Sequence, residues 1–181
     1  MGMRSVYLRR PDTVELRLYS AGRRGKFRVW WPVVVALIVI AIESTDTFSS
    51  ENTSGWIRPV VERFFGHIND QLWAVIHHLA RKSGHFTGYG GLALTLLRAW
   101  LMTLGLREGL TSGGWRWGAF WRAVAGTAFV ASLDESHQAF IPSRTGMFSD
   151  VVLDTVGGTV LCGMVWLFCG WWRKAKATAD L

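Results

Sequence analysis

Apolar residues along this chain are gathered into four long stretches that polar segments separate. These stretches, over residues 27–47, 83–104, 115–140 and 149–172, are close to the roughly 20 residues that an α-helix needs to cross the hydrocarbon of a membrane. We therefore predict an all-α, polytopic membrane protein. Its four stretches would form a four-helix transmembrane bundle within a membrane domain of residues 29–172.

One further segment, residues 56–79, has apolar positions at helical spacing mixed with Glu62, Arg63, His67 and Asp70. This mixture is typical of an amphipathic helix that lies in the membrane interface and does not cross it. We expect it to lie flat on the outer interface beside the bundle. Two roles remain open for it, a lid over the bundle and an anchor that covers it.

The overall composition agrees with a membrane protein. Half of the residues are hydrophobic and only 18% are charged, against about 25% in an average soluble domain. The net charge of +7 does not indicate nucleic-acid binding, because eight of the 20 basic residues lie in the first 28 positions and the others flank apolar stretches. Membrane lipids are therefore the expected partners.

The basic segments predict how the chain is oriented in the membrane. They are a tail of residues 1–28, the loop 105–116 and a second tail of residues 173–181. With four spans these three segments lie on one side of the membrane, and Lys and Arg collect on the cytoplasmic side. We therefore expect a multi-pass protein of the cell membrane with both termini in the cytoplasm.

Ionisable residues cluster where the spans reach the outer side. A charged side chain at the centre of a spanning helix costs roughly 3 kcal/mol, so such residues usually face a protein interior or a water-filled cavity. Each interhelical polar contact in a membrane stabilises a bundle by only about 0.6 kcal/mol on average. Stability alone is therefore a weak reason for the chain to keep so many ionisable residues in one place. We take this cluster as the functional site. It contains Lys82, His85, Tyr89, Asp134, Glu135, Gln138, Arg144, Asp150 and Asp154.

The cluster contains the groups that acid–base or nucleophilic catalysis needs. His85 is the candidate base or nucleophile, since imidazole titrates near neutral pH. A neighbouring carboxylate, Asp134 or Glu135, would hold its ring, and the remaining acid would protonate a leaving group. These three residues are the candidate catalytic set.

Other residues of the cluster are suited to binding. Arg144 offers a planar fork for a phosphate or a carboxylate, and Lys82 offers a second positive charge. Tyr89 and Gln138 would orient the substrate. The candidate substrate-binding residues are Lys82, Tyr89, Gln138, Arg144, Asp150 and Asp154.

The acids also allow a divalent cation to bind. Zinc is disfavoured, because His85 is the one well-placed histidine and the two cysteines, Cys162 and Cys169, lie deeper in the fourth stretch. The carboxylates that would hold a cation are Asp134, Glu135, Asp150 and Asp154.

The order and spacing of these residues resemble the VanZ-like family of integral membrane proteins over roughly residues 30–172. The motifs that carry the resemblance are Lys82-x-x-His85-x-x-x-Tyr89, Asp134-Glu135-x-x-Gln138, Pro142-Ser143-Arg144 and Asp150. The family includes a protein associated with low-level teicoplanin resistance, so the resemblance implies a membrane location and a link to glycopeptide tolerance. It does not define a reaction.

The chain departs from the family's pattern at two positions. Asp154 stands where the family often has Asn, which adds a second acid and could alter metal or proton affinity. Ser143 stands where the family often has Gly, which is a milder change. Gly157 and Gly158 fit the small-residue packing expected in the fourth span.

Three functions fit these residues. The first is an enzyme, a hydrolase or transferase that acts from the outer face on the headgroup of an envelope lipid or a lipid-linked glycan. The second is a protein that binds or transports an anionic amphiphile or an ion without chemistry. The third is a structural partner in a larger envelope complex. A polar set confined to one side and the lack of an internal repeat disfavour a transporter.

Overall fold

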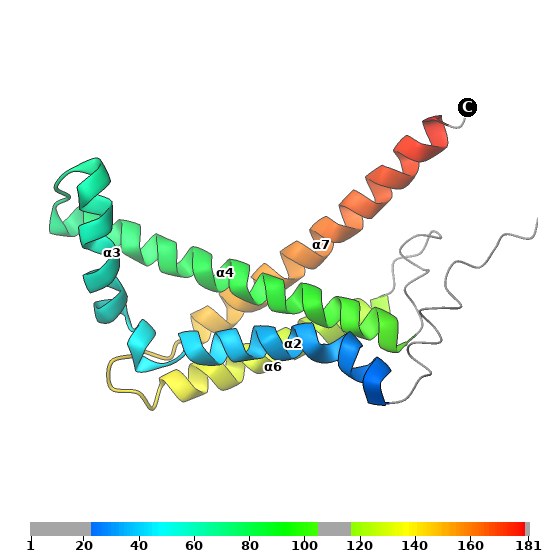
Figure 1. The fold of residues 1–181 in the computed structure, drawn as a ribbon, viewed down its shortest axis with the longest axis horizontal. Coiled ribbons are helices and arrows are strands. Elements are labelled where there is room, and N and C mark those ends of the chain that lie inside the picture. Colours follow the sequence, from blue (N-terminus) through cyan, green and yellow to red (C-terminus); the bar gives the residue numbers. More distant parts are fainter. Residues whose placement is uncertain (1–22, 105–116, 180–181) are drawn as a thin grey trace, which may run out of the picture.

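The computed structural model describes residues 23–104 and 117–179, with side chains over 25–104 and 117–169. Within these ranges the chain is helical and contains no strand, which confirms the all-α prediction (Figure 1). The parts of the expected tails and loop at residues 1–22, 105–116 and 180–181 lie outside the described residues. The elements are α2 (Arg23–Glu43), the 3₁₀ helix η1 (Asp46–Phe48), α3 (Ser50–Phe65), α4 (Asp70–Thr103), α6 (Trp117–Gln138) and α7 (Phe148–Ala179).

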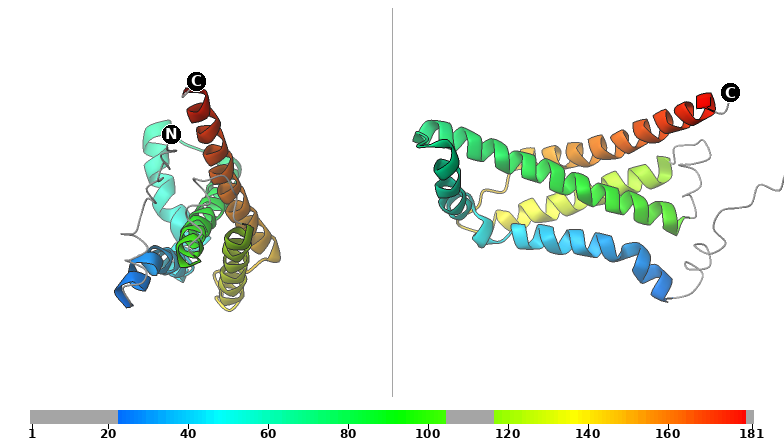
Figure 2. Two further views of the ribbon diagram at one scale, coloured as in Figure 1. Left: turned by 90° about the vertical axis from the view of Figure 1, so that its right-hand side faces the viewer. Right: turned by 45° about the horizontal axis from the view of Figure 1, so that its top comes forward.

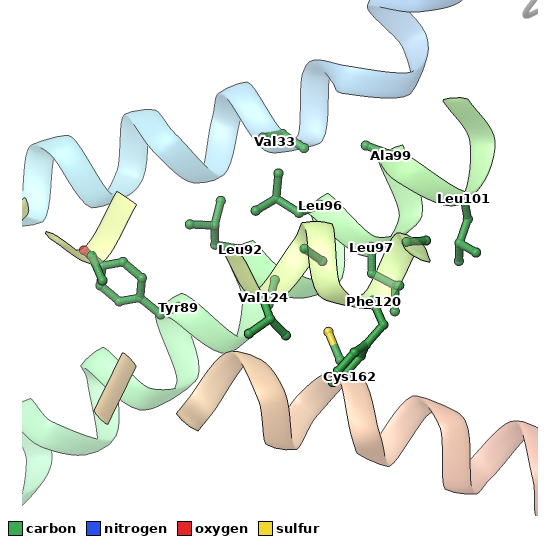
Figure 3. Packing of buried hydrophobic residues seen from close by; sticks show 14 of the residues in the cluster. Val33, Tyr89, Leu92, Leu96, Leu97, Ala99, Leu101, Phe120, Val124 and Cys162 are labelled. Atoms are coloured by element: carbon green, nitrogen blue, oxygen red, sulfur yellow. The ribbon is translucent and has the colours of Figure 1, made fainter. Parts of the chain in front are cut away.

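Helix α4 occupies the centre of the structure. It packs against α2, α6 and α7, and Figure 2 shows it between α2 on one side and α6 with α7 on the other. Apolar side chains from α4, α6 and α7 fill the space between them (Figure 3). Members of this core include Leu92, Leu96, Leu97, Phe120 and Val124, together with the buried thiol of Cys162.

Helix α7 approaches α4 very closely. A Cβ added at Gly157 would collide with the carbonyl oxygen of Phe86, and one at Gly158 would lie 3.0 Å from the Cβ of Ala93. Small residues at a helix interface let the two backbones come together, which maximises van der Waals contact. The packing role expected of these two glycines is confirmed.

The amphipathic helix expected over residues 56–79 is divided in the structure, so this prediction was wrong. Helix α3 stops at Phe65 because Gly66 takes a left-handed conformation, with φ of 81°, and its N–H donates to Glu62 O at 2.9 Å. Asn69 then caps a new helix. That helix, α4, continues without a break into the expected second span and reaches 34 residues, which is about 51 Å at 1.5 Å per residue.

Helix α3 is held against the first turns of α4 by polar contacts. The indole N–H of Trp73 donates to Ser54 Oγ at 2.7 Å, and Thr53 Oγ1 lies 3.1 Å from His77 Nε2. Burial, together with the nearby Arg81, lowers the pKa of His77. The contact with Thr53 is therefore a hydrogen bond of a neutral imidazole at pH 7.

Among the residues that the structure describes, two helices are long and apolar enough to cross a membrane, namely Gly25–Glu43 within α2 and Phe148–Cys169 within α7. Helices α4 and α6, which were also expected to span, are not among them. Arg98 in α4, and Arg122 and Asp134 in α6, lower the mean hydropathy of these two helices. Exposed apolar side chains mark a lipid-facing or docking surface on α2 and α7. They include Val34, Ile38, Ile42, Val152, Val156 and Val160.

The close contact of α7 with α4 gives a first prediction. We expect Gly157→Ala to lower the free energy of unfolding by about 1–3 kcal/mol, because the added methyl forces the two backbones apart. Gly163→Ala is the matched control, since a Cβ there meets no atom within 4 Å. Thermal unfolding in detergent measures both variants. Equal unfolding temperatures for the two would contradict the packing described here.

Candidate functional site

The polar residues of the cluster meet beside α4, where α2 and α6 end and α7 begins (Figure 1). The α4 residues lie one turn apart on one face, as their spacing predicts. The structure therefore brings all nine candidate side chains to one region of the molecule, although they divide into separate contacts within it.

His85 is held by an acid, but by a different one from those expected. Its Nδ1 lies 3.4 Å from Oδ2 of Asp154, which is fully buried. The prediction that Asp134 or Glu135 holds the ring is therefore replaced by Asp154 from α7. The ring also stacks on Tyr89, with centroids 6.2 Å apart and an interplanar angle of 21°.

Asp134 accepts hydrogen bonds from two neutral side chains. The hydroxyl of Tyr89 donates to Asp134 Oδ2 at 2.8 Å, and Gln138 Nε2 donates to the same oxygen at 2.9 Å. Figure 3 shows Tyr89 at one end of the apolar core, separate from the leucines further along α4. Asp134 is thus fixed between α4 and its own helix, and neither of these partners is a cation.

Glu135 is buried at the end of α6, with 5% of its surface exposed. Its Oε2 accepts the backbone N–H of Met147 at 2.7 Å, whereas its Oε1 is buried without a hydrogen-bond partner. Gly146 makes this contact possible, because a Cβ at that position would collide with the carbonyl oxygen of Glu135. Gly146 was not among the predicted residues, and a lone loop glycine gives no signal of such a role.

Lys82 and Asp150 form an ion pair between α4 and the first turn of α7. Their side chains are 29% and 15% exposed, respectively. Both were predicted to bind substrate. In the structure each one already has a partner of opposite charge.

Arg144 holds the end of α2. Its Nη2 donates to the carbonyl oxygens of Glu43 at 2.5 Å and Thr45 at 2.7 Å, and its Nε is buried without a partner. Burial, and secondarily the charge of Arg81, lower the pKa of Arg144, but a guanidinium remains charged at neutral pH. A cation at a helix C-terminus satisfies carbonyls that the helix leaves without partners. The structure thus gives Arg144 a positioning role beside its expected role in binding.

Two cavities adjoin at this cluster. The first, of about 790 Å³, runs between α2 and α4, and the second, of about 480 Å³, lies beneath α3 and the start of α7. Asp134 lines the first cavity and Asp150 the second, whereas Glu135 and Asp154 line neither and lie behind His85. The residues that line both cavities are His77, Arg81, His85, Gln138 and Arg144.

Two of these shared residues, His77 and Arg81, were not among the predicted site residues. They precede His85 by eight and four residues, so one face of α4 carries all three side chains. The interfacial helix was expected to end at residue 79 and the second span to begin at residue 83, so His77 and Arg81 were not expected on the same helix as His85. A single continuous helix would have indicated their shared face.

Three residues could hold a metal ion. His85, Glu135 and Asp154 each offer one ligand atom, and these atoms lie within 4.8 Å of one another. This set differs from the four acids expected from the sequence. Asp150 is paired with Lys82, and Asp134 accepts two hydrogen bonds instead.

Comparison with known proteins agrees with the motifs. A family model described as VanZ/LLP1 matches residues 27–169, which include every residue of the cluster. No curated protein and no solved structure matches the chain. The family resemblance drawn from the sequence is therefore confirmed over most of the chain.

The contacts of Arg144 give a second prediction. We expect Arg144→Ala to lower the free energy of unfolding by about 3 kcal/mol, because two carbonyl oxygens lose a charged donor. Arg63→Ala, at an exposed position on α3, should change it by less than about 0.5 kcal/mol. Thermal unfolding and limited proteolysis between α2 and α3 provide the measurements. An Arg144→Ala protein as stable and protease-resistant as Arg63→Ala would exclude the positioning role.

Proposed function

The chain belongs to the VanZ/LLP1 family, and we propose that it is a multi-pass membrane protein that acts on an envelope lipid. Its substrate would be a lipid headgroup or a lipid-linked glycan precursor, reached from the outer face of the membrane. The observation that carries this proposal is the 790 Å³ cavity, whose apolar wall leads to the polar cluster.

The apolar part of that cavity suits a hydrocarbon chain. Val35 and Val39 of α2 face Leu92 and Thr95 of α4 across it. A volume of this size is typical of small-molecule sites. Each buried methylene of a lipid chain contributes about 0.8 kcal/mol relative to water. A lipid chain lying between α2 and α4 would place its polar end beside His85.

The polar part of the two cavities suits an anionic headgroup. Arg81 and Arg144 line both cavities, and Lys82 lines the second. A phosphate or carboxylate would be attracted by this positive charge, and an arginine can bind either group with two parallel hydrogen bonds. Arg81 is the better placed of the two arginines for this contact, because Arg144 already donates to backbone carbonyls.

The proposed topology places this cluster near the outer surface. Helices α2 and α7 would cross the membrane, and α4 from residue 83 and α6 would cross beside them. The length of α4, about 51 Å, exceeds the roughly 30 Å of hydrocarbon. Its first turns and α3 would then lie outside the membrane, and the basic tails would lie in the cytoplasm.

The proposed chemistry centres on His85. Asp154 holds Nδ1 of the ring, which leaves Nε2 to accept the proton of an attacking water or hydroxyl. Attack at the headgroup phosphorus or ester carbon would break the bond to the leaving oxygen, and the imidazolium would return its proton to that oxygen. Asp134 contacts the same cavity, with its carboxylate fixed by Tyr89 and Gln138.

A second candidate function is capture of an anionic lipid without chemistry. The observation that favours it is that Lys82 and Arg144 already have protein partners, which leaves Arg81 as the principal cation for the substrate. Transport of such an amphiphile or of an ion belongs to the same class. A link to glycopeptide tolerance would follow from either function, through the lipids that the envelope displays.

The catalytic proposal predicts the effect of removing the imidazole. We expect His85→Gln to lower turnover of the correct lipid by at least about 100-fold, the usual minimum contribution of a general base. The protein would be assayed in nanodiscs against phospholipids and undecaprenyl-linked substrates, with products measured by mass spectrometry. His67→Gln, between α3 and α4 and exposed, is the matched control. Equal turnover by both variants would exclude catalysis by His85.

The lipid cavity gives a further prediction. Gly91 lines the first cavity, and a Cβ there meets no atom within 4 Å, so Gly91→Phe would place an aromatic ring at the cavity wall and reduce the space for a lipid chain. We expect this variant to lose most of the lipid that co-purifies with the wild type, as measured by native mass spectrometry. Ile38→Phe, exposed on α2 and outside the cavity lining, should retain it. Loss of lipid from both variants, or from neither, would contradict this binding site.

A further inference from the structure

We propose that His85, Glu135 and Asp154 bind one divalent transition-metal ion between α4, α6 and α7. One ligand atom from each residue lies within 4.8 Å of the others. Imidazole nitrogen and carboxylate oxygen are both ligands for such ions. This site shares His85 with the lipid site proposed above, but ion binding does not depend on lipid turnover.

Each carboxylate of this set keeps one oxygen that no protein donor reaches. Glu135 is 95% buried and Asp154 is fully buried, and their atoms Oε1 and Oδ1 have no hydrogen-bond partner. The other oxygen of each is held in place, by Met147 N–H and by the His85 ring, respectively. Buried polar atoms in proteins nearly always have a partner. Two buried carboxylates that each keep a free oxygen, grouped with one imidazole, form a donor set that suits a cation.

The charge balance of the interior points the same way. Asp134, Glu135 and Asp154 interact electrostatically with one another, and the basic side chains near them are His85, which contacts Asp154, and Arg144. Lys82 is already paired with Asp150. Buried carboxylates need a compensating charge close by. A divalent ion would add positive charge beside Glu135 and Asp154.

The spacing of the ligands indicates which ions fit. The 3.4 Å between His85 Nδ1 and Asp154 Oδ2 is long for a hydrogen bond. Two ligands about 2.1 Å from a tetrahedral Zn²⁺ lie about 3.4 Å apart. The sequence disfavoured zinc because it contains one well-placed histidine, yet carboxylates also bind zinc. This one distance is compatible with Zn²⁺, and Mn²⁺, which accepts the same ligands, is the second ion to test.

The ion would change the part that His85 plays. Coordinated through Nδ1, the ring could no longer act as the base, and Nε2–H would be left to donate to a substrate. A metal-bound water would then supply the nucleophile and lose its own proton more readily. His85 also lines both cavities, so an ion held by His85, Glu135 and Asp154 would add positive charge beside the space where a lipid phosphate is proposed to lie.

The test measures ion binding by the full chain in detergent, without a polyhistidine tag. Protein stripped with EDTA would be titrated with Zn²⁺ and, separately, with Mn²⁺, and the bound metal would be measured by mass spectrometry. We expect one ion per chain. Glu135→Gln and Asp154→Asn should each weaken binding by at least about tenfold, since even the loss of a residue that only supports a ligand costs about 10–100-fold.

Matched controls replace carboxylates elsewhere with the same amides. Glu62→Gln in α3 and Asp70→Asn in the first turn of α4 remove acids that pair with Arg58, outside the proposed ligand set, and both should bind the ion as the wild type does. A wild type that binds neither ion would overturn the proposal. Equal affinity in the site variants and the controls would also overturn it.

A spectroscopic measurement keeps the proposal testable if the site variants do not fold. X-ray absorption of Zn²⁺ bound to the wild type should show one imidazole and otherwise oxygen ligands. Two or more imidazoles, or a sulfur ligand, would place the ion elsewhere in the chain and overturn the assignment. Neither result depends on whether the protein turns over or retains a lipid.

Discussion

The close approach of α7 to α4 is the contact on which the rest of the structure depends. Gly157 lies directly against the carbonyl oxygen of Phe86, the residue that follows His85, and three residues before Gly157 is Asp154. The same approach therefore sets the distance between the imidazole and its acid. Because polar contacts between membrane helices contribute only about 0.6 kcal/mol each on average, the packed glycine interface must hold the polar groups in place.

The apolar core and the polar cluster occupy different parts of the bundle. The apolar core occupies the half of α4 that follows Tyr89, where Leu92, Leu96 and Leu97 pack against α6 and α7. The polar cluster occupies the other half, where helices end and loops begin. Site geometry is most accurate when it is supported by rigid, packed elements. The apolar core supplies this support through the packed helices α4, α6 and α7, and Arg144 adds to it by fixing the end of α2.

Helical periodicity was enough to predict an all-α fold, and motif order was enough to predict the family. The apolar stretches predicted helices, and the spacing of Lys82, His85 and Tyr89 placed these three residues on one face of α4. The boundary between α3 and α4 could not be predicted in this way. The apolar periodicity runs through Gly66 without a change of phase, whereas the chain turns there because of one backbone angle. The same error hid the shared face of His77 and Arg81 with His85.

The pairing of side chains within the site was not available from the sequence. Which acid meets His85 depends on how α6 and α7 are rotated about their own axes, and one residue of rotation is about 100°. Asp154 was therefore as plausible a partner as Glu135 before the structure. The partners of Arg144 are backbone carbonyls, which leave no trace in the sequence because every residue has one.

Some polar groups of the cluster have hydrogen-bond or ion-pair partners, whereas others have a buried atom without a partner. The ion pair of Lys82 with Asp150 joins α4 to α7, and the hydrogen bond from Arg144 to the carbonyl oxygen of Glu43 fixes the end of α2. Both contacts act as structural links. Glu135 and Asp154 each retain a buried oxygen without a donor. If Glu135 and Asp154 were only structural links, apolar side chains in their place would cost less free energy, because no buried oxygen would then lack a hydrogen-bond donor. The unsatisfied acids, more than the charges at the cavity rim, are therefore the reason to propose this cluster as a functional site.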